Sequence, residues 1–159
     1  MSDGIRIIKP GDIGWIISQH GLIYSKEFKF DSRFEVDIAR KVVALCKKED
    51  GFTRIWIKEV GGVNAGSIAV SKRGKATVFI NFLLVINRYR GRGIAQELMN
   101  HALGYAKSAG FQKIRLETYS CLTIARKIYA TFGFRISGPI KRLNRYGQSF
   151  DQEFWELHL

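Results

Sequence analysis

An arginine- and glycine-rich loop at residues 88–93 has residue types that suit the binding of phosphate groups. A long apolar stretch precedes the loop and an amphipathic helical pattern follows it, so we expect the loop to end at a helix N-terminus. The first N–H groups of a helix have no partner within the helix, and the helix dipole adds positive potential there. Glycine leaves these groups open to a diphosphate, and arginine offers charge-assisted hydrogen bonds. The predicted ligands are the side chains of Arg88, Arg90 and Arg92 and the backbone at Gly91, Gly93, Ile94 and Ala95.

This loop differs from two common nucleotide-binding patterns. No Gly-Lys-Ser/Thr sequence follows it, which excludes a P-loop, and its spacing is not that of the dinucleotide-binding Gly-x-Gly-x-x-Gly motif. The strands before it are also predicted to be antiparallel, unlike those of a dinucleotide-binding fold. A simple turn with solvated arginines is the remaining alternative.

The periodicity of the apolar residues predicts the elements that position the loop. Strands are expected at residues 5–8, 54–60, 64–72, 76–86, 113–118, 134–137 and 153–158. Helices are expected at residues 12–24, 31–46, 92–109 and 122–132. A capping box from Ser32 to Glu35 is predicted to begin the second helix. The strand at 76–86 is apolar on both faces and should be central. The predicted fold is α/β, with a mixed, mostly antiparallel central sheet and helices on both faces, in a single domain over residues 4–159.

The composition limits the class of protein. The chain has 159 residues, 46% of them hydrophobic, and a formal net charge of +12, as expected for one soluble domain with anionic partners. No apolar run is long enough to cross a membrane, and the first residues lack the apolar core of a signal peptide, so we expect a cytoplasmic protein. Its two cysteines and three histidines have no metal-ligand spacing, and no metal site is predicted.

Two motifs resemble those of a known family. The spacing Arg88-x-x-Gly91-x-Gly93 resembles the coenzyme-A motif of the GNAT family of N-acetyltransferases, and residues 129–134 resemble the family's Tyr-x-x-x-Gly-Phe segment. Residues 83–85 are similar to the end of its fourth strand, and the resemblance covers nearly the whole chain. It implies the acyl-CoA N-acyltransferase fold, acetyl-CoA as the cofactor, and transfer of an acetyl group to a primary amine of a small molecule, an amino acid or a protein.

The resemblance also implies roles for single residues. It assigns the backbone at Leu83, Leu84 and Val85 to the pantetheine amides, with the N–H near Val85 as an oxyanion donor. It assigns Tyr129 to the general acid. Proton transfer from a tyrosine to a thiolate is uphill by about 2 kcal/mol, so hydrogen-bond stabilisation of the thiolate is an equal alternative. Leu122 stands where many members carry an asparagine that binds the cofactor. Two basic residues near it are candidate phosphate partners, Arg126 and Lys127.

The general base is less determined. His20 and Glu27 lie in the helical segment that borders the acceptor site in this family, and both are candidates. Glu117 is better explained by a surface ion pair. Three aromatic residues are candidates for the lining of the acceptor pocket, namely Trp15, Tyr24 and Phe28.

The N-terminal part resembles a narrower group. The pattern Arg6-x-x-x-Pro10-Gly11-Asp12 and the segment that follows it are similar to the acetyltransferase half of bifunctional MarR-type regulator/acetyltransferases. No winged-helix half is present, so we expect the catalytic module alone, without a DNA-binding role.

Two other functions remain open. The positive charge, with arginines near Tyr89 and Tyr146, is compatible with a basic nucleic-acid-binding module, although the chain has no recognition-helix or RNP-type motif. A catalytically silent acyl-CoA sensor is suggested by Leu122 alone. The sequence leaves the oligomeric state open; many members of the family form homodimers through their last strands, and only the resemblance points to a homodimer here.

Overall fold

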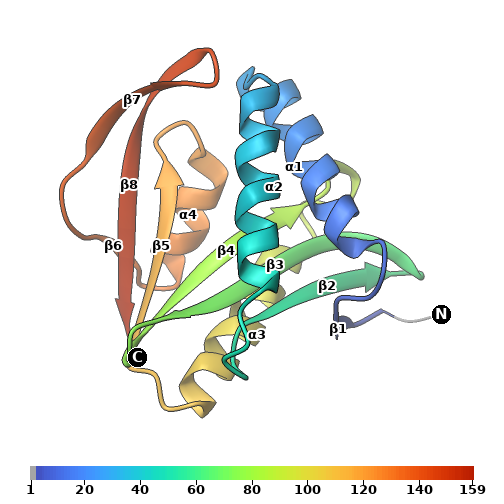
Figure 1. Ribbon diagram of the computed structural model, residues 1–159, viewed down its shortest axis with the longest axis vertical. Coiled ribbons are helices and arrows are strands. Elements are labelled where there is room, and N and C mark those ends of the chain that lie inside the picture. The colour runs from blue at the N-terminus through green and yellow to red at the C-terminus, as the bar shows by residue number, and fades with distance from the viewer. Residues whose placement is uncertain (1–2) are drawn as a thin grey trace.

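The computed structural model describes residues 3–159 and contains an eight-stranded sheet with helices against both faces (Figure 1). The strand order is β1-β2-β3-β4-β5-β8-β6, and β7 pairs with the first part of β8. Every pair is antiparallel except β4 with β5. The prediction of a mixed, mostly antiparallel sheet is therefore confirmed. The elements are β1 (Ile5–Ile7), α1 (Asp12–Phe28), α2 (Ser32–Cys46), β2 (Arg54–Val60), β3 (Val63–Arg73), β4 (Thr77–Val85), the 3₁₀ turn η1 (Asn87–Tyr89), α3 (Ile94–Ser108), β5 (Lys113–Tyr119), α4 (Thr123–Thr131), β6 (Arg135–Ile136), β7 (Lys141–Arg145) and β8 (Gln148–His158).

Two apolar clusters lie on opposite faces of the sheet. Side chains of α3 and α4, such as Leu98, pack with Ile68 and Val78 on one face. Side chains of α1 and α2, such as Val42, pack with Ile57 on the other face, where the two helices lie side by side (Figure 1). Strand β4 lies in the middle of the sheet, as its two-sided apolar pattern predicted.

The first two helices differ from their predicted ends. Helix α1 continues to Phe28, four residues beyond the predicted end, and Lys29 closes it in the left-handed conformation (φ 61°). Helix α2 has Asp31 as its N-cap, whose carboxylate accepts the N–H of Arg33 at 3.0 Å. Ser32 is already helical, so the predicted capping box from Ser32 to Glu35 is wrong: Asp31 satisfies the first amides instead.

The hairpin formed by β7 and β8 was only partly predicted. Strand β8 begins at Gln148 and not near residue 153, and its first residues pair with the unpredicted strand β7. Leu143 is the one buried side chain of β7, so no apolar alternation marks this strand. The hairpin turn is held by tertiary contacts: the Tyr146 hydroxyl donates to Asp37 at 2.7 Å, and the N–H of Asp31 donates to the Tyr146 carbonyl at 3.1 Å.

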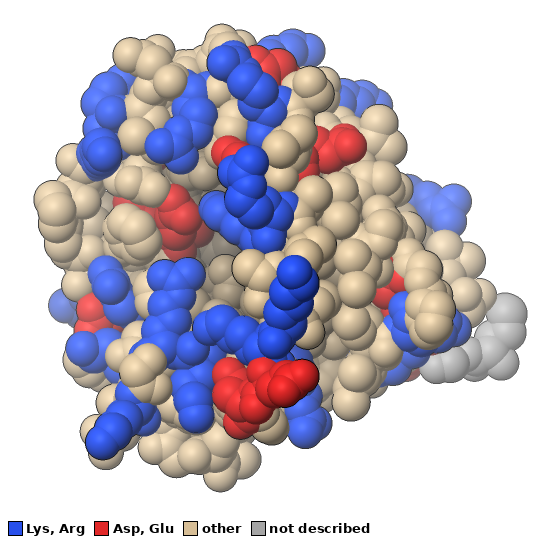
Figure 2. All heavy atoms as spheres, in the orientation of Figure 1, with Lys and Arg blue, Asp and Glu red and all other residues tan. Residues whose placement is uncertain are grey.

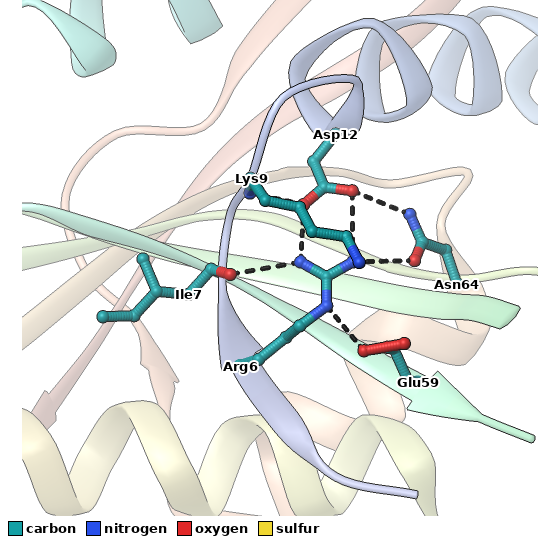
Figure 3. Close-up of polar contacts among 6 residues, drawn as sticks. All are labelled: Arg6, Ile7, Lys9, Asp12, Glu59 and Asn64. Carbon is teal, nitrogen blue, oxygen red and sulfur yellow. Dashed lines mark hydrogen bonds and ion pairs between the residues drawn. The ribbon is translucent and has the colours of Figure 1, made fainter. Parts of the chain in front are cut away.

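A polar cluster joins the start of α1 to the sheet (Figure 3). The guanidinium group of Arg6, on β1, donates to Asp12 at 2.6 Å, to Glu59 at 2.6 Å and to Asn64 at 3.1 Å. Asp12 also accepts the side-chain amide of Asn64 and the N–H of Lys9. The N-terminal pattern from Arg6 to Asp12 thus has a structural use, since it fixes the first residue of α1 against β1, β2 and β3.

Basic side chains are spread over the face seen in Figure 2, around a central hollow, with acidic side chains among them. Several form ion pairs, including Lys41 with Glu117 at 3.7 Å and Arg142 with Asp151 at 3.1 Å. The surface ion pair predicted for Glu117 is therefore present. None of the helices in residues 3–159 has the length and apolar character needed to span a membrane.

Candidate acyl-CoA site at the end of strand β4

Strands β4 and β5 are paired only along their first halves. The pairing runs from Thr77 opposite Lys113 to Ile80 opposite Leu116. Beyond it, β5 stays beside β8 and β4 stays beside β3. A β-bulge in β4 contains Phe82 in the left-handed conformation (φ 56°). Because a bulge bends its strand, the two strands separate there and leave an opening in the sheet.

The separation exposes backbone groups of β4. The N–H of Ile86 donates to Ala65 of β3 at 2.9 Å, and successive residues of a strand direct these groups to opposite sides. The N–H and C=O groups of Leu83 and Val85 therefore face the opening. The Val85 carbonyl accepts a hydrogen bond from Nε of Arg90 at 3.1 Å, which agrees with this direction. The Leu84 side chain is buried beneath the same segment.

The loop after β4 forms a continuous group of free N–H donors. Gly91 and Gly93 both have φ 77°, a conformation that favours glycine, and Gly93 is the N-cap of α3. The first hydrogen bond of α3 runs from the N–H of Glu97 to the carbonyl of Gly93 at 3.0 Å. From Gly91 to Gln96, no backbone N–H donates to any residue that the structure describes. Such a run of donors at the N-terminus of a 15-residue helix matches the needs of a diphosphate.

The arginine side chains around the loop differ in their interaction partners. The guanidinium groups of Arg88 and Arg92 lie over the ring of Tyr89, at 4.9 and 5.2 Å from its centre. Neither forms an ion pair within residues 3–159. Arg126, a predicted phosphate partner, instead donates to the buried carboxylate of Glu153 at 2.9 and 3.1 Å. Arg88, whose Nη2 also donates to the Tyr89 hydroxyl at 3.1 Å, and Arg92 are thus arginines of this region without a carboxylate partner among residues 3–159.

A cavity of about 600 Å³ joins these features. Strand β4 and the loop form one side of it, the C-terminal half of α1 a second side, and α4 with the residue before it a third side. Its lining residues are Ile23, Tyr24, Glu27, Phe28, Leu83, Leu84, Val85, Tyr89, Arg90, Gly91, Gly93, Ile94, Ala95, Gln96, Leu122, Thr123, Ile124, Ala125, Lys127 and Ile128. The predicted cofactor ligands are among them except for Arg88, Arg92 and Arg126. Arg88 and Arg92 lie over the ring of Tyr89, which is itself a lining residue.

Tyr129 and Tyr24 differ in whether their side chains line this cavity. Tyr129 is buried, with 7% of its surface exposed, and is not one of the lining residues. Burial raises its pKa. Tyr24 does line the cavity, and its pKa is raised first by burial and then by Tyr129, Cys121 and Glu27. Tyr24 belongs to α1 and Tyr129 belongs to α4.

The two candidate bases have different surroundings. His20 lies outside the cavity, with 2% of its surface exposed; its ring stacks on Tyr24, and its Nδ1 contacts the Ile16 carbonyl at 2.7 Å. Burial lowers the pKa of His20 to about 4. Glu27 lines the cavity, but its carboxylate is paired with the guanidinium group of Arg90. The structure therefore brings only Glu27 to the cavity, and not as a free carboxylate.

Sequence patterns alone missed part of the lining. Tyr24 and Phe28 were predicted there and are present, whereas Trp15 is not a lining residue and packs, half-buried, against the apolar cluster of α1 and α2. The lining also includes apolar residues of α4, namely Ile124, Ala125 and Ile128, and the preceding Leu122, which is 9% exposed. Their helical spacing does not reveal that β4 and β5 separate beneath them, which is the reason they face a cavity.

Comparisons with known proteins agree with this geometry. The sequence model of the acetyltransferase (GNAT) family matches residues 22–134. The chain is 28% identical over 118 residues to N-acetyltransferase 8B of Rattus norvegicus, covering 71% of this chain and 48% of that one. It is 28% identical over 107 residues to N-acetyltransferase 8F1 of the same species, covering 64% of this chain and 44% of that one. The chain therefore spans about half the length of the curated relatives it matches.

Solved structures show the same fold at low sequence identity. The ribosomal-protein-alanine N-acetyltransferase of Brucella melitensis has a TM-score of 0.77 and 15% identity, covering 98% of this chain and 99% of that one. The protein yncA of Salmonella typhimurium, solved with its cofactor acetyl-CoA, has a TM-score of 0.77 and 16% identity, covering 100% of this chain and 95% of that one. The family match over most of the chain, together with this fold and the loop at the end of β4, shows that the chain belongs to the acetyltransferase (GNAT) family.

Proposed function

We propose that this protein is an acetyl-CoA-dependent N-acetyltransferase, in which a primary amine attacks the thioester directly. The observation that carries the proposal is the run of free N–H groups from Gly91 to Gln96, at the end of a strand whose edge is also open. The free N–H groups of the loop fit a diphosphate, and the open edge of the strand fits a chain of amides. Coenzyme A contains both, in that order.

The residues present fit such a cofactor. The free N–H groups of the loop would bind the diphosphate, with Arg88 and Arg92 adding charge-assisted hydrogen bonds. Lys127, which lines the cavity from α4, would lie near other phosphate oxygens. The open backbone groups of Leu83 and Val85 would pair with the pantetheine amides as a neighbouring strand does.

The chemistry follows from the same positions. When bound, acetyl-CoA supplies an acetyl thioester that an uncharged amine can attack. The N–H of Val85, on the open edge of β4, would donate to the oxygen that becomes negatively charged, a contribution of a few kcal/mol in acyl transfer generally. Burial raises the pKa of Tyr129, so complete transfer of its proton to the leaving thiolate is less favourable than for an exposed tyrosine. We therefore assign Tyr129 as a hydrogen-bond donor to that thiolate.

The acceptor would enter along α1. The α1 side of the cavity presents the apolar or aromatic side chains of Ile23, Tyr24 and Phe28. Its one carboxylate, that of Glu27, is already neutralised by Arg90. These surroundings favour a primary amine carried on an apolar group over a polyamine. They also favour an amine that loses its proton before it binds, so the rate should rise with pH towards the pKa of the free amine.

We further infer that residues 4–159 act as one catalytic domain. The names of the curated relatives, which are N-acetyltransferases, support the activity. The narrower resemblance to the acetyltransferase half of MarR-type fusions and the cytoplasmic location remain predictions from the sequence.

Calorimetric titration with acetyl-CoA tests the proposal. The intact chain should bind acetyl-CoA, and Gly93→Val should lose the binding because a β-branched residue disfavours φ 77° at this loop. Gly104→Ala is the matched control, since Gly104 is exposed within α3 and an added Cβ would meet no atom within 4 Å. Arg88→Ala/Arg92→Ala tests the same site without changing a backbone conformation. Absence of binding by the intact chain would overturn the proposal. If the intact chain binds, release of free coenzyme A with a panel of arylalkyl amines, polyamines and amino acids would identify the acceptor class.

A further inference from the structure

Arg90 and Glu27 form a bridge across the cavity. Nη1 of Arg90 donates to Oε1 of Glu27, Nη2 donates to Oε2 at 3.0 Å, and Nε donates to the Val85 carbonyl at 3.1 Å. Glu27 is in the last turn of α1 and Val85 is the last residue of β4. One side chain therefore connects a helix and a strand that form two different sides of the cavity.

The bridge uses all three nitrogen atoms of Arg90. A bidentate pair with a carboxylate and a third bond to a carbonyl hold the planar guanidinium group in one orientation. The pair is also partly shielded from water, because 29% of the Arg90 side chain and 32% of the Glu27 side chain are exposed. Hydrogen bonding to Glu27 raises the pKa of Arg90. Arg90 thus differs from Arg88 and Arg92, whose guanidinium groups have no carboxylate partner among residues 3–159.

The bridge lies between the aromatic side chains of α1 and the open edge of β4. Glu27 is one turn after Tyr24 and directly before Phe28, and both aromatic residues line the cavity from α1. Val85 belongs to the open edge of β4, where the thioester would lie. The distance between the α1 side chains and that edge therefore depends on Arg90.

We propose that Arg90 is a positioning residue, which acts through Glu27 to hold the α1 wall of the acceptor site at a fixed distance from the end of β4. This inference rests on the proposed acetyltransferase function. Arg90 then contributes little to phosphate binding, which falls to Arg88, Arg92 and the loop N–H groups. Glu27 contributes as the anchor of Arg90 and not as a general base.

Four proteins test the inference: the intact chain, Arg90→Lys, Glu27→Gln and Arg88→Ala. Lysine retains the charge but cannot form the bidentate pair and the carbonyl bond together. Arg90→Lys and Glu27→Gln should change the dissociation constant of acetyl-CoA by less than about twofold and lower kcat/KM for the amine by about 10- to 100-fold, since small displacements in an active site have effects of that size. Arg88→Ala should weaken acetyl-CoA binding by about tenfold and leave the KM of the amine nearly unchanged.

Two further measurements distinguish a positioning role from the alternatives, in which Glu27 is a general base or Arg90 is a phosphate ligand. In a double-mutant cycle, Arg90→Lys/Glu27→Gln should be no worse than either single variant, because both break one bridge. The pH profile of kcat/KM for the amine should keep its acidic limb in Glu27→Gln, because that limb reports the free amine. Loss of that limb would make Glu27 a base, and an Arg90→Lys variant that weakens acetyl-CoA binding as Arg88→Ala does would make Arg90 a phosphate ligand. Either result overturns the inference, whereas failure of the intact chain to bind acetyl-CoA would overturn the proposed function itself.

Discussion

Lowering the pH from 7 to 5 should destabilise this protein mainly through His20. The imidazole ring is buried between α1 and the sheet, where it stacks on Tyr24 and meets the edge of Phe82. No carboxylate among residues 3–159 pairs with it, so protonation would place an uncompensated charge in the core. Burial lowers its pKa from 6.5 to about 4, although the contact with the Ile16 carbonyl opposes this effect.

The sign and size of the effect follow from linkage. Between these two pKa values the unfolded chain binds a proton at this position and the folded chain does not. The contribution to stability is therefore fully present above pH 6.5 and is lost as the pH falls towards 4. Each unit of pKa difference corresponds to about 1.4 kcal/mol, so the full loss is about 3 kcal/mol, of which about 2 kcal/mol has occurred at pH 5.

Urea unfolding at pH 7 and pH 5 measures this loss. With a slope of about 2 kcal/mol per M, the midpoint of the intact chain should fall by about 1 M between the two pH values. His20→Phe keeps an aromatic ring at the site but cannot be protonated, so its midpoint should fall much less over the same interval. Comparing each protein with itself removes any packing cost of the phenylalanine. The exposed His158→Gln variant serves as the control and should behave like the intact chain. Equal losses in the intact chain and His20→Phe would refute the assignment of a lowered pKa to His20.

Three further substitutions have definite expected outcomes. Tyr129→Phe should lower kcat by about 10- to 100-fold without weakening acetyl-CoA binding, as steady-state kinetics and calorimetry would show; an unchanged kcat would remove Tyr129 from the mechanism. Asp12→Asn should destabilise the fold by about 2 kcal/mol, since it leaves the half-buried guanidinium group of Arg6 with Glu59 as its one carboxylate partner, and an unchanged urea midpoint would contradict this. Lys29→Gly should raise the free energy of unfolding by a few tenths to about 1 kcal/mol, because Lys29 closes α1 at φ 61°; a lower urea midpoint would show that the lysine side chain has another role.

Local sequence patterns predicted the parts of the protein that depend on neighbouring residues. The loop from Arg88 to Gly93 could be placed at a helix start because its glycines and the following apolar stripe are contiguous in the sequence. The central position of β4 followed from its two apolar faces. Even within such segments, the choice between Asp31 and Ser32 as the N-cap of α2 was not decided by the pattern, since both residue types are good caps.

The features that the sequence did not predict depend on contacts between distant segments. Strand β7 has one buried side chain, Leu143, and it is a strand because β8 pairs with it. Arg126 looked available for a phosphate, but Glu153 lies beside it in the fold. His20 looked like a candidate base, and only its depth in the core distinguishes it from one. Residue type limits the chemical roles that a side chain can have. Its burial and its interaction partners in the fold determine which of these roles is available.

Helix α1 illustrates how such distant contacts serve a site. Its first residue, Asp12, is held against the sheet by Arg6, and its penultimate residue, Glu27, is held by Arg90. Both anchors are arginine–carboxylate pairs, in which the fork of the guanidinium group fixes direction as well as distance. A helix fixed at both ends can keep the aromatic side chains of its last turns at a constant distance from β4. The helix that forms the proposed acceptor wall is thus positioned by ion pairs at its two ends, and the chemistry proposed for the cavity depends on the second of them.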